Sequence, residues 1–161
     1  YPLRKHDCPP ITDGASALII ATREVAEKVL AGTGKRPVYI TGIDHRIESH
    51  QLGTRDLTSS MSTRIAGEHA GVSKGKVDIA ELHAPFSHQE ILLKEALGLD
   101  DNTVINPSGG PLAGNIFMSA GLDRIGAVAT RIMNGEANRG VAHATSGACL
   151  QQNLVAVLEG K

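Results

Sequence analysis

The sequence is poor in aromatic residues and has no tryptophan. Aromatic residues make up 2% of its 161 residues, whereas 41% of the residues are hydrophobic. This composition favours tightly packed layers of helix on sheet over a β-sandwich built on aromatic anchors, so we predict an α/β fold. A chain of this length usually forms one domain.

Other absences exclude several classes of partner. Sixteen basic and seventeen acidic side chains give a net charge of −1, so no nucleic-acid partner is expected. The sequence has no apolar run of roughly 18 residues and no signal peptide, which argues against membrane insertion. Cys8 and Cys149 lie far apart without CxxC spacing, which predicts neither a disulfide nor a zinc site and favours the cytoplasm.

Apolar spacing and turn residues predict alternating strands and helices after an irregular lead-in over residues 1–15. Expected strands cover residues 16–21, a buried apolar run, and residues 38–43, 77–83, 140–144 and 154–159. Expected helices start after Thr22, near residue 60, at the capping pair Ser87 and Glu90, and near residue 119. Residues 44–58 are expected to form a loop. This order predicts a five-stranded mixed sheet covered by helices, closed by an antiparallel hairpin.

Histidine is abundant enough to raise a metal hypothesis. None of the seven histidines has HExxH spacing, so we expect no metal site. His83 ends a predicted strand directly before a predicted helix, at the kind of corner where α/β folds place chemistry. The alternative for His83 is a polar residue satisfied at a sheet edge.

Two loops are rich in small residues. Residues 106–110 (NPSGG) lack GxGxxG spacing, so they predict either a tight turn with positive φ or an anion site before a helix. Residues 145–149 (TSGAC) carry hydroxyl and thiol groups. The sequence has no GxSxG elbow for a serine triad, and Cys149 is interpreted as a buried small hydrophobe.

Four segments together resemble the C-terminal half of the thiolases in order and approximate spacing. They are residues 13–17 (DGASA), residues 81–87 (ELHAPFS), residues 106–110 and the final hairpin. The resemblance covers essentially residues 1–161 and implies one βαβαβαββ half of a two-half fold. The N-terminal half with its nucleophilic cysteine would be absent. The opening residues 1–6, which lack an initiator methionine, fit a fragment of a longer chain.

The resemblance also implies roles for individual residues. His83 stands where thiolases have an oxyanion-site Asn and the sterol-carrier branch has His. Asn115 replaces the His that activates the nucleophile, and an amide is no general base near neutral pH. His143 could provide acid or base chemistry near neutral pH, or serve a structural role, with Cys149 out of register. The expected contacts to an acyl-CoA thioester are Ser108, Gly109, Gly110, Ser146 and Gly147.

The function implied by the resemblance is acyl transfer at a carbon–carbon bond next to a CoA thioester, in lipid or sterol metabolism. The thioester is the substrate, no cofactor is bound, and the full protein is expected to be a homodimer. One alternative is a retro-aldol lyase that works with an OB-fold partner carrying a zinc ribbon. Another is a non-catalytic thiolase-like subunit or lipid-binding module. The 161 residues alone are expected to show no turnover and to self-associate through an uncovered apolar face.

Overall fold

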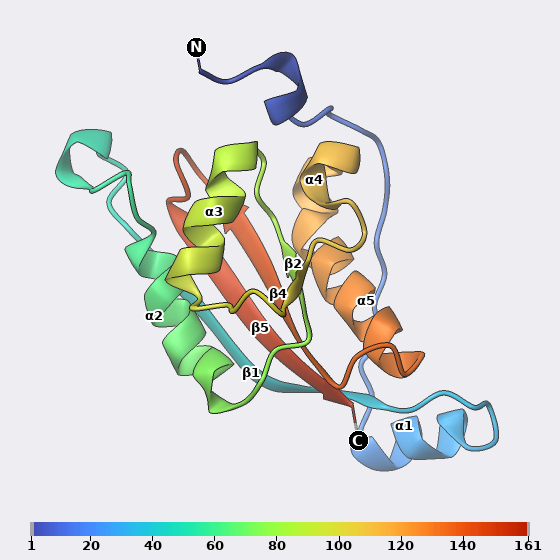
Figure 1. The fold of residues 1–161 in the computed structure, drawn as a ribbon. Helices are drawn as coiled ribbons and strands as arrows, with labels where there is room; N and C mark the ends of the chain where they lie inside the picture. Colours follow the sequence, from blue (N-terminus) through green and yellow to red (C-terminus); the bar gives the residue numbers. More distant parts are fainter. Residues whose placement is uncertain (1, 161) are drawn as a thin grey trace.

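The fold is a mixed five-stranded sheet between two layers of helices, as a computed structural model describes it for residues 2–160 (Figure 1). The sheet order is β1–β5–β4–β2–β3, and β5 runs antiparallel to both of its neighbours. The predicted α/β class and five-stranded mixed sheet are confirmed. The strands are β1 Val38–Ile47, β2 Ile79–Leu82, β3 Val104–Ile105, β4 Arg139–Ser146 and β5 Gln152–Gly160. The helices are α1 Arg23–Leu30, α2 Met61–Ala70, α3 Ser87–Ala96, α4 Gly110–Ala113 and α5 Ala120–Met133.

Two apolar clusters hold the layers together, one on each face of the sheet. Successive side chains of a strand point to opposite faces, and β5 follows this rule. Val155 and Val157 join the cluster under α2 and α3, whereas Ala156 and Leu158 join the cluster under α5. α5 contributes Val128 and Ile132, which are both fully buried. The apolar spacing predicts an inner face at residues 122, 125, 129 and 132, and this is only partly correct, because Leu122 is 45% exposed whereas Val128 is fully buried.

The prediction of a buried strand at residues 16–21 is wrong. These residues form no strand, and the side chains of Ile19 and Ile20 are 98% and 83% exposed. The segment runs along α5, so its backbone has no neighbouring strand to pair with (Figure 1). The fifth strand is β3 instead, which pairs parallel with Ile79 and Ala80 of β2. The βαβαβαββ order is present but starts at Val38.

Two further local predictions are corrected by the structure. β1 extends to Ile47 because its ladder with β5 continues, so the loop expected from residue 44 begins later. The start of α3 is stabilised by Gln89, whose Oε1 accepts a hydrogen bond from Phe86 N at 3.1 Å. Ser87 and Glu90 do not form the expected capping pair, since Ser87 Oγ donates to Asp7 Oδ1 at 2.7 Å.

Gly42 allows α2 to pack directly on β1. It lies at an irregularity in the pairing of β1 with β5, and a Cβ at this position would lie 1.9 Å from the carbonyl oxygen of Ala70. We expect Gly42→Ala to lower the free energy of unfolding by about 1–3 kcal/mol, as overpacking does. Urea denaturation measures this loss. Gly53→Ala is the control, because its Cβ would meet nothing within 4 Å, and an equal loss there would contradict the prediction.

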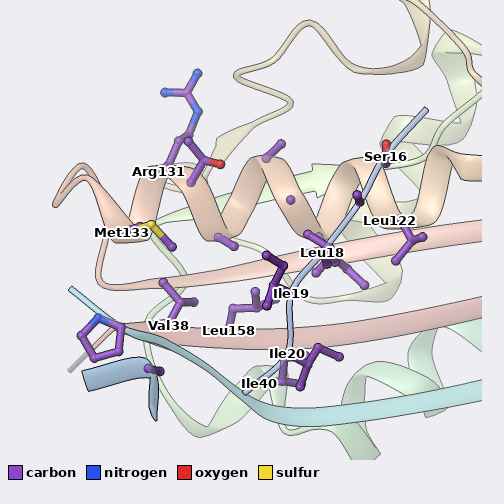
Figure 2. A pocket seen from close by; sticks show the side chains of 18 of the residues that line it. Ser16, Leu18, Ile19, Ile20, Val38, Ile40, Leu122, Arg131, Met133 and Leu158 are labelled. Carbon is purple, nitrogen blue, oxygen red and sulfur yellow. The ribbon is translucent and has the colours of Figure 1, made fainter. Parts of the chain in front are cut away.

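An apolar groove of about 1280 Å³ opens between residues 15–21, α1, β1 and α5. Figure 2 shows Ile19, Ile20, Ile40 and Leu122 among its lining residues. α1 begins after the Thr22 cap, as predicted, yet it contains no buried residue. The groove is therefore bounded on two sides by segments that pack only loosely on the sheet. His83 and Asn115 are not part of its lining.

Candidate functional site

The side chains of His83 and Asn115 meet at the carboxyl end of β2. His83 directly follows the last residue of this strand, and its N–H donates to the carbonyl of His143 at 3.2 Å, which continues the pairing with β4. Asn115 lies in the turn after α4. His83 Nε2 and Asn115 Oδ1 are 3.2 Å apart, and the two residues are only 6% and 3% exposed. The structure thus brings together two residues that are far apart in the sequence.

The hydrogen bonds of His83 indicate which of its ring nitrogens carries the proton. The backbone N–H of Thr145 donates to His83 Nδ1 at 3.4 Å, so the ring proton lies on Nε2 and is donated to Asn115 Oδ1. Burial lowers the pKa of His83, and the nearby charge of Arg124 lowers it further, against the opposing effect of the bonds to Asn115 and Thr145. His83 is therefore neutral near pH 7. Its proton is directed at Asn115, which leaves the amide nitrogen of Asn115 as the group that can donate to a ligand.

The structure bears on the two alternatives for His143, acid or base chemistry near neutral pH and a structural role. His143 lies in β4, is 1% exposed, and donates from Nε2 to Asn153 Oδ1 at 2.9 Å. Asn153 Nδ2 in turn donates to Ser62 Oγ of α2 at 2.7 Å. Burial lowers the pKa of His143 to about 4. The bond to Asn153 opposes this shift, and the charge that His83 carries when it is protonated in acid adds a smaller effect in the same direction as burial. These contacts favour the structural role for His143.

The burial of His143 predicts a loss of stability in acid. Because its pKa in the fold is about 4 and its ordinary value is 6.5, the unfolded chain binds the proton more readily. Its contribution is complete above pH 6.5 and falls as the pH drops from there to 4, by about 3 kcal/mol in total. Denaturation of the wild type and of His143→Asn at pH 7.5 and 4.5 measures how much of the pH dependence of unfolding comes from His143. An equally steep pH dependence in both proteins would refute the prediction.

The glycine-rich loop before α4 is a tight turn attached to β2. Gly109 and Gly110 have φ values of 93° and 60°, which a residue with a side chain rarely adopts. Ser108 donates to Glu81 twice, from its backbone N–H at 2.9 Å and from Oγ at 2.7 Å. The turn interpretation is confirmed, and the loop is held beside the strand that carries His83. Its role in binding a thioester stays a prediction.

The loop between β4 and β5 presents small residues to solvent. Ser146 and Gly147 are exposed at the end of β4, next to the residue that bonds to His83. Cys149 is also exposed, so the interpretation of it as a buried hydrophobe is wrong. Cys149 and Leu150 have φ values of 51° and 57°, and this turn directs Leu150 into the core and Cys149 outward.

A buried ion pair next to the site was missed from the sequence. Glu81 is fully buried, and its Oε2 lies 3.0 Å from Arg124 Nη1. Both residues are embedded in apolar patterns, Glu81 in the strand VDIAEL and Arg124 in the inner face of α5. An acidic and a basic residue at positions that the pattern predicts to be buried are the signal that could have indicated an ion pair, since buried charges are usually paired. Only the fold shows that these two charges meet.

Residues 2–160 contain neither a cluster of metal ligands nor a membrane-spanning helix. No three side chains of His, Cys, Asp or Glu come together in a way that could hold a metal ion. None of the helices described there has the length and apolarity needed to cross a bilayer.

Comparison with known proteins relates the chain to the thiolases. It is 28% identical over 152 residues to an acetyl-CoA acetyltransferase of Methanocaldococcus jannaschii, covering 79% of this chain and 38% of that protein. It is 28% identical over 155 residues to benzoylsuccinyl-CoA thiolase subunit BbsB of Thauera aromatica, covering 83% and 40%. Sterol carrier protein 2 of Rattus norvegicus is 33% identical over 129 residues, covering 64% and 23%.

The chain aligns with only part of each relative. It spans about two fifths of the length of the first two relatives, and no family model matches it. The relatives include acetyl-CoA acetyltransferases, a thiolase subunit and sterol carrier protein 2, and the fold has the expected five-stranded mixed sheet. The chain is a distant homologue of the thiolases.

Proposed function

We propose that these residues form the C-terminal part of a thiolase-like acyl-CoA acyltransferase, which acts on a carbon–carbon bond next to a thioester. The observation that carries this proposal is the contact of His83 Nε2 with Asn115 Oδ1, at 3.2 Å in a buried setting. A thioester oxygen next to the amide nitrogen of Asn115 receives a hydrogen bond from a group oriented by His83. A preorganised donor of this kind typically stabilises an oxyanion by about 2.7–4 kcal/mol.

The proposed whole protein includes an N-terminal thiolase half that supplies the nucleophilic cysteine. That half covers the groove between residues 15–21 and α5, and the full protein forms a homodimer. The proposal is supported by the exposure of Ile19 and Ile20, since large apolar surfaces usually have a partner. Residues 108–110 together with Ser146 and Gly147 contact the CoA thioester, which is the substrate and needs no additional cofactor.

The second candidate is a retro-aldol lyase acting on a lipid or sterol acyl-CoA with an OB-fold, zinc-ribbon partner. Two observations favour it. Asn115 stands where thiolases have a His and cannot act as a base near neutral pH, and His143 is buried and neutral. Retro-aldol cleavage needs no activated cysteine nucleophile. It needs an oxyanion site for the enolate and a base for a β-hydroxyl group, and neither Asn115 nor His143 is that base. The similarity to sterol carrier protein 2 supports the lipid or sterol assignment.

Trapping of an acyl-enzyme distinguishes the candidates. A thiolase-length protein that carries these residues is incubated with acyl-CoA labelled in the acyl group, with and without the OB-fold partner. A labelled cysteine together with thiolysis products supports the acyltransferase. Turnover of a β-hydroxyacyl-CoA without a labelled cysteine supports the lyase. Binding of acyl-CoA without label or product would overturn both and leave a non-catalytic subunit or lipid-binding module.

A further inference from the structure

Glu81 is the centre of a hydrogen-bond cluster beside the His83–Asn115 pair. Its side chain is fully buried on the α5 face of β2. Oε1 accepts from Ser108 N at 2.9 Å, and Oε2 accepts from Ser108 Oγ at 2.7 Å and from Arg124 Nη1 at 3.0 Å. Arg124 Nη1 also donates to Ser108 Oγ at 3.0 Å, which closes the cluster. An ionised carboxylate at full burial requires partners of this kind.

The two partners of Glu81 lie on either side of Asn115 in the chain. Ser108 precedes Asn115 in the glycine-rich loop, and Arg124 follows it in α5. Between Ser108 and the start of α5 at Ala120, the segment contains the one-turn helix α4 and a short 3-10 turn, Phe117–Ser119. Apart from the bond that the Thr12 N–H donates to the Asn115 carbonyl at 3.1 Å, this segment has few backbone bonds, so its position depends largely on where its two ends are attached. Both ends are attached to the same carboxylate.

The partner of the Asn115 side chain is carried by the same stretch of backbone as Glu81. His83 follows Glu81 by two residues, and side chains at this spacing along an extended strand lie on the same face. The backbone of β2 thus holds the ring of His83 and the carboxylate of Glu81 at a fixed separation. Arg124 provides a further link, because its charge is close enough to affect the pKa of His83.

We propose that Glu81 is the positioning residue of this site: its carboxylate holds both ends of the segment that presents Asn115 to His83. Ser108 and Arg124 are the two residues through which the segment is bound to Glu81. The backbone of β2 between Glu81 and His83 sets the distance from the carboxylate to the imidazole ring. The importance of this arrangement for catalysis rests on the proposed function. The positioning itself is a property of the geometry and is tested without an assay of activity.

The test is the effect of Glu81→Gln on the imidazole of His83, measured by nitrogen-15 NMR on the 161-residue chain. In the wild type the spectrum should show one tautomer, with the proton on Nε2 and slow exchange with water. Loss of the carboxylate should release the segment and break the contact with Asn115. Exchange of the Nε2 proton should then accelerate by at least about tenfold, the factor that corresponds to a lost hydrogen bond worth about 1.4 kcal/mol.

The matched control removes a carboxylate from another arginine pair. Glu159 Oε1 accepts from Arg139 Nε at 2.8 Å, and Glu159→Gln makes the same chemical change in β5 without touching the segment around Asn115. A similar acceleration in the control would show that general destabilisation moves the signal and would overturn the proposal. An unchanged Nε2 signal in folded Glu81→Gln would overturn it as well. If Glu81→Gln does not fold, Ser108→Ala is measured in its place. The same acceleration of Nε2 proton exchange is expected, and an unchanged His83 signal would contradict the proposal.

Discussion

His83→Ala should reduce kcat for acyl-CoA turnover in a thiolase-length protein by about 100- to 1000-fold, the usual effect of losing one oxyanion-site donor. In the structure, His83 Nε2 donates to Asn115 Oδ1 at 3.2 Å and thereby directs the amide nitrogen of Asn115 away from the ring. Without the imidazole, the amide loses its orientation and Asn115 loses a buried partner. Steady-state kinetics with saturating acyl-CoA measure this loss, which should appear in kcat more than in KM.

His88→Ala is the matched control for this variant. His88 lies on α3 close to His83 in the sequence, but it is exposed, and its ring stacks on the Phe86 ring at a centroid distance of 6.1 Å. Its replacement should leave kcat nearly unchanged. Because His83→Ala leaves a buried partner without its hydrogen bond, it should unfold at a lower denaturant concentration than His88→Ala, so kcat is compared under conditions where both variants are folded. Wild-type kcat in a folded His83→Ala protein would contradict the proposed oxyanion site.

The second large effect is expected from Arg139→Ala, which should lower the free energy of unfolding by about 3 kcal/mol, as the breaking of a buried pair does. The guanidinium group of Arg139 donates to the carbonyl oxygens of Gly71, Val72 and Gly75 at 2.6–2.9 Å, directly after α2. Its Nε donates to Glu159 at 2.8 Å. Because Glu159 is one third exposed, the estimate is at the lower end of what such a loss costs.

Arg64→Ala is the control for the arginine prediction. Arg64 forms an ion pair with Glu68 at 2.8 Å on the surface of α2, and both side chains are at least half exposed. An exposed pair of this spacing contributes about 0.3–0.5 kcal/mol. Urea denaturation of both variants should therefore give clearly different losses. A loss for Arg139→Ala no larger than that for Arg64→Ala would show that the buried hydrogen bonds of Arg139 do not stabilise the fold.

Helix periodicity and strand composition were sufficient for most of the architecture. The apolar residues of α5 and the continuous apolar run of β5 reflect burial, which is a local property of each segment, so the sequence carries it. The apolar run at residues 16–21 carries the same signal, yet it does not form the strand that the signal predicts. Its pattern shows that it is suited to burial, but whether a strand forms depends on a neighbour that offers backbone hydrogen bonds. The two-residue β3 is too short to leave a pattern at all.

The same distinction between local pattern and tertiary contact applies to the candidate site. The sequence alone determined the residue types at its centre: His83 at a strand end and an amide, not a base, at position 115. The tertiary structure decided that these two side chains meet, that His143 is buried and neutral, and that Glu81 is paired with Arg124. Such facts depend on contacts between residues far apart in the chain, and side-chain pKa and orientation follow from those contacts. A linear pattern records what each residue is, whereas its partners exist only once the layers have packed.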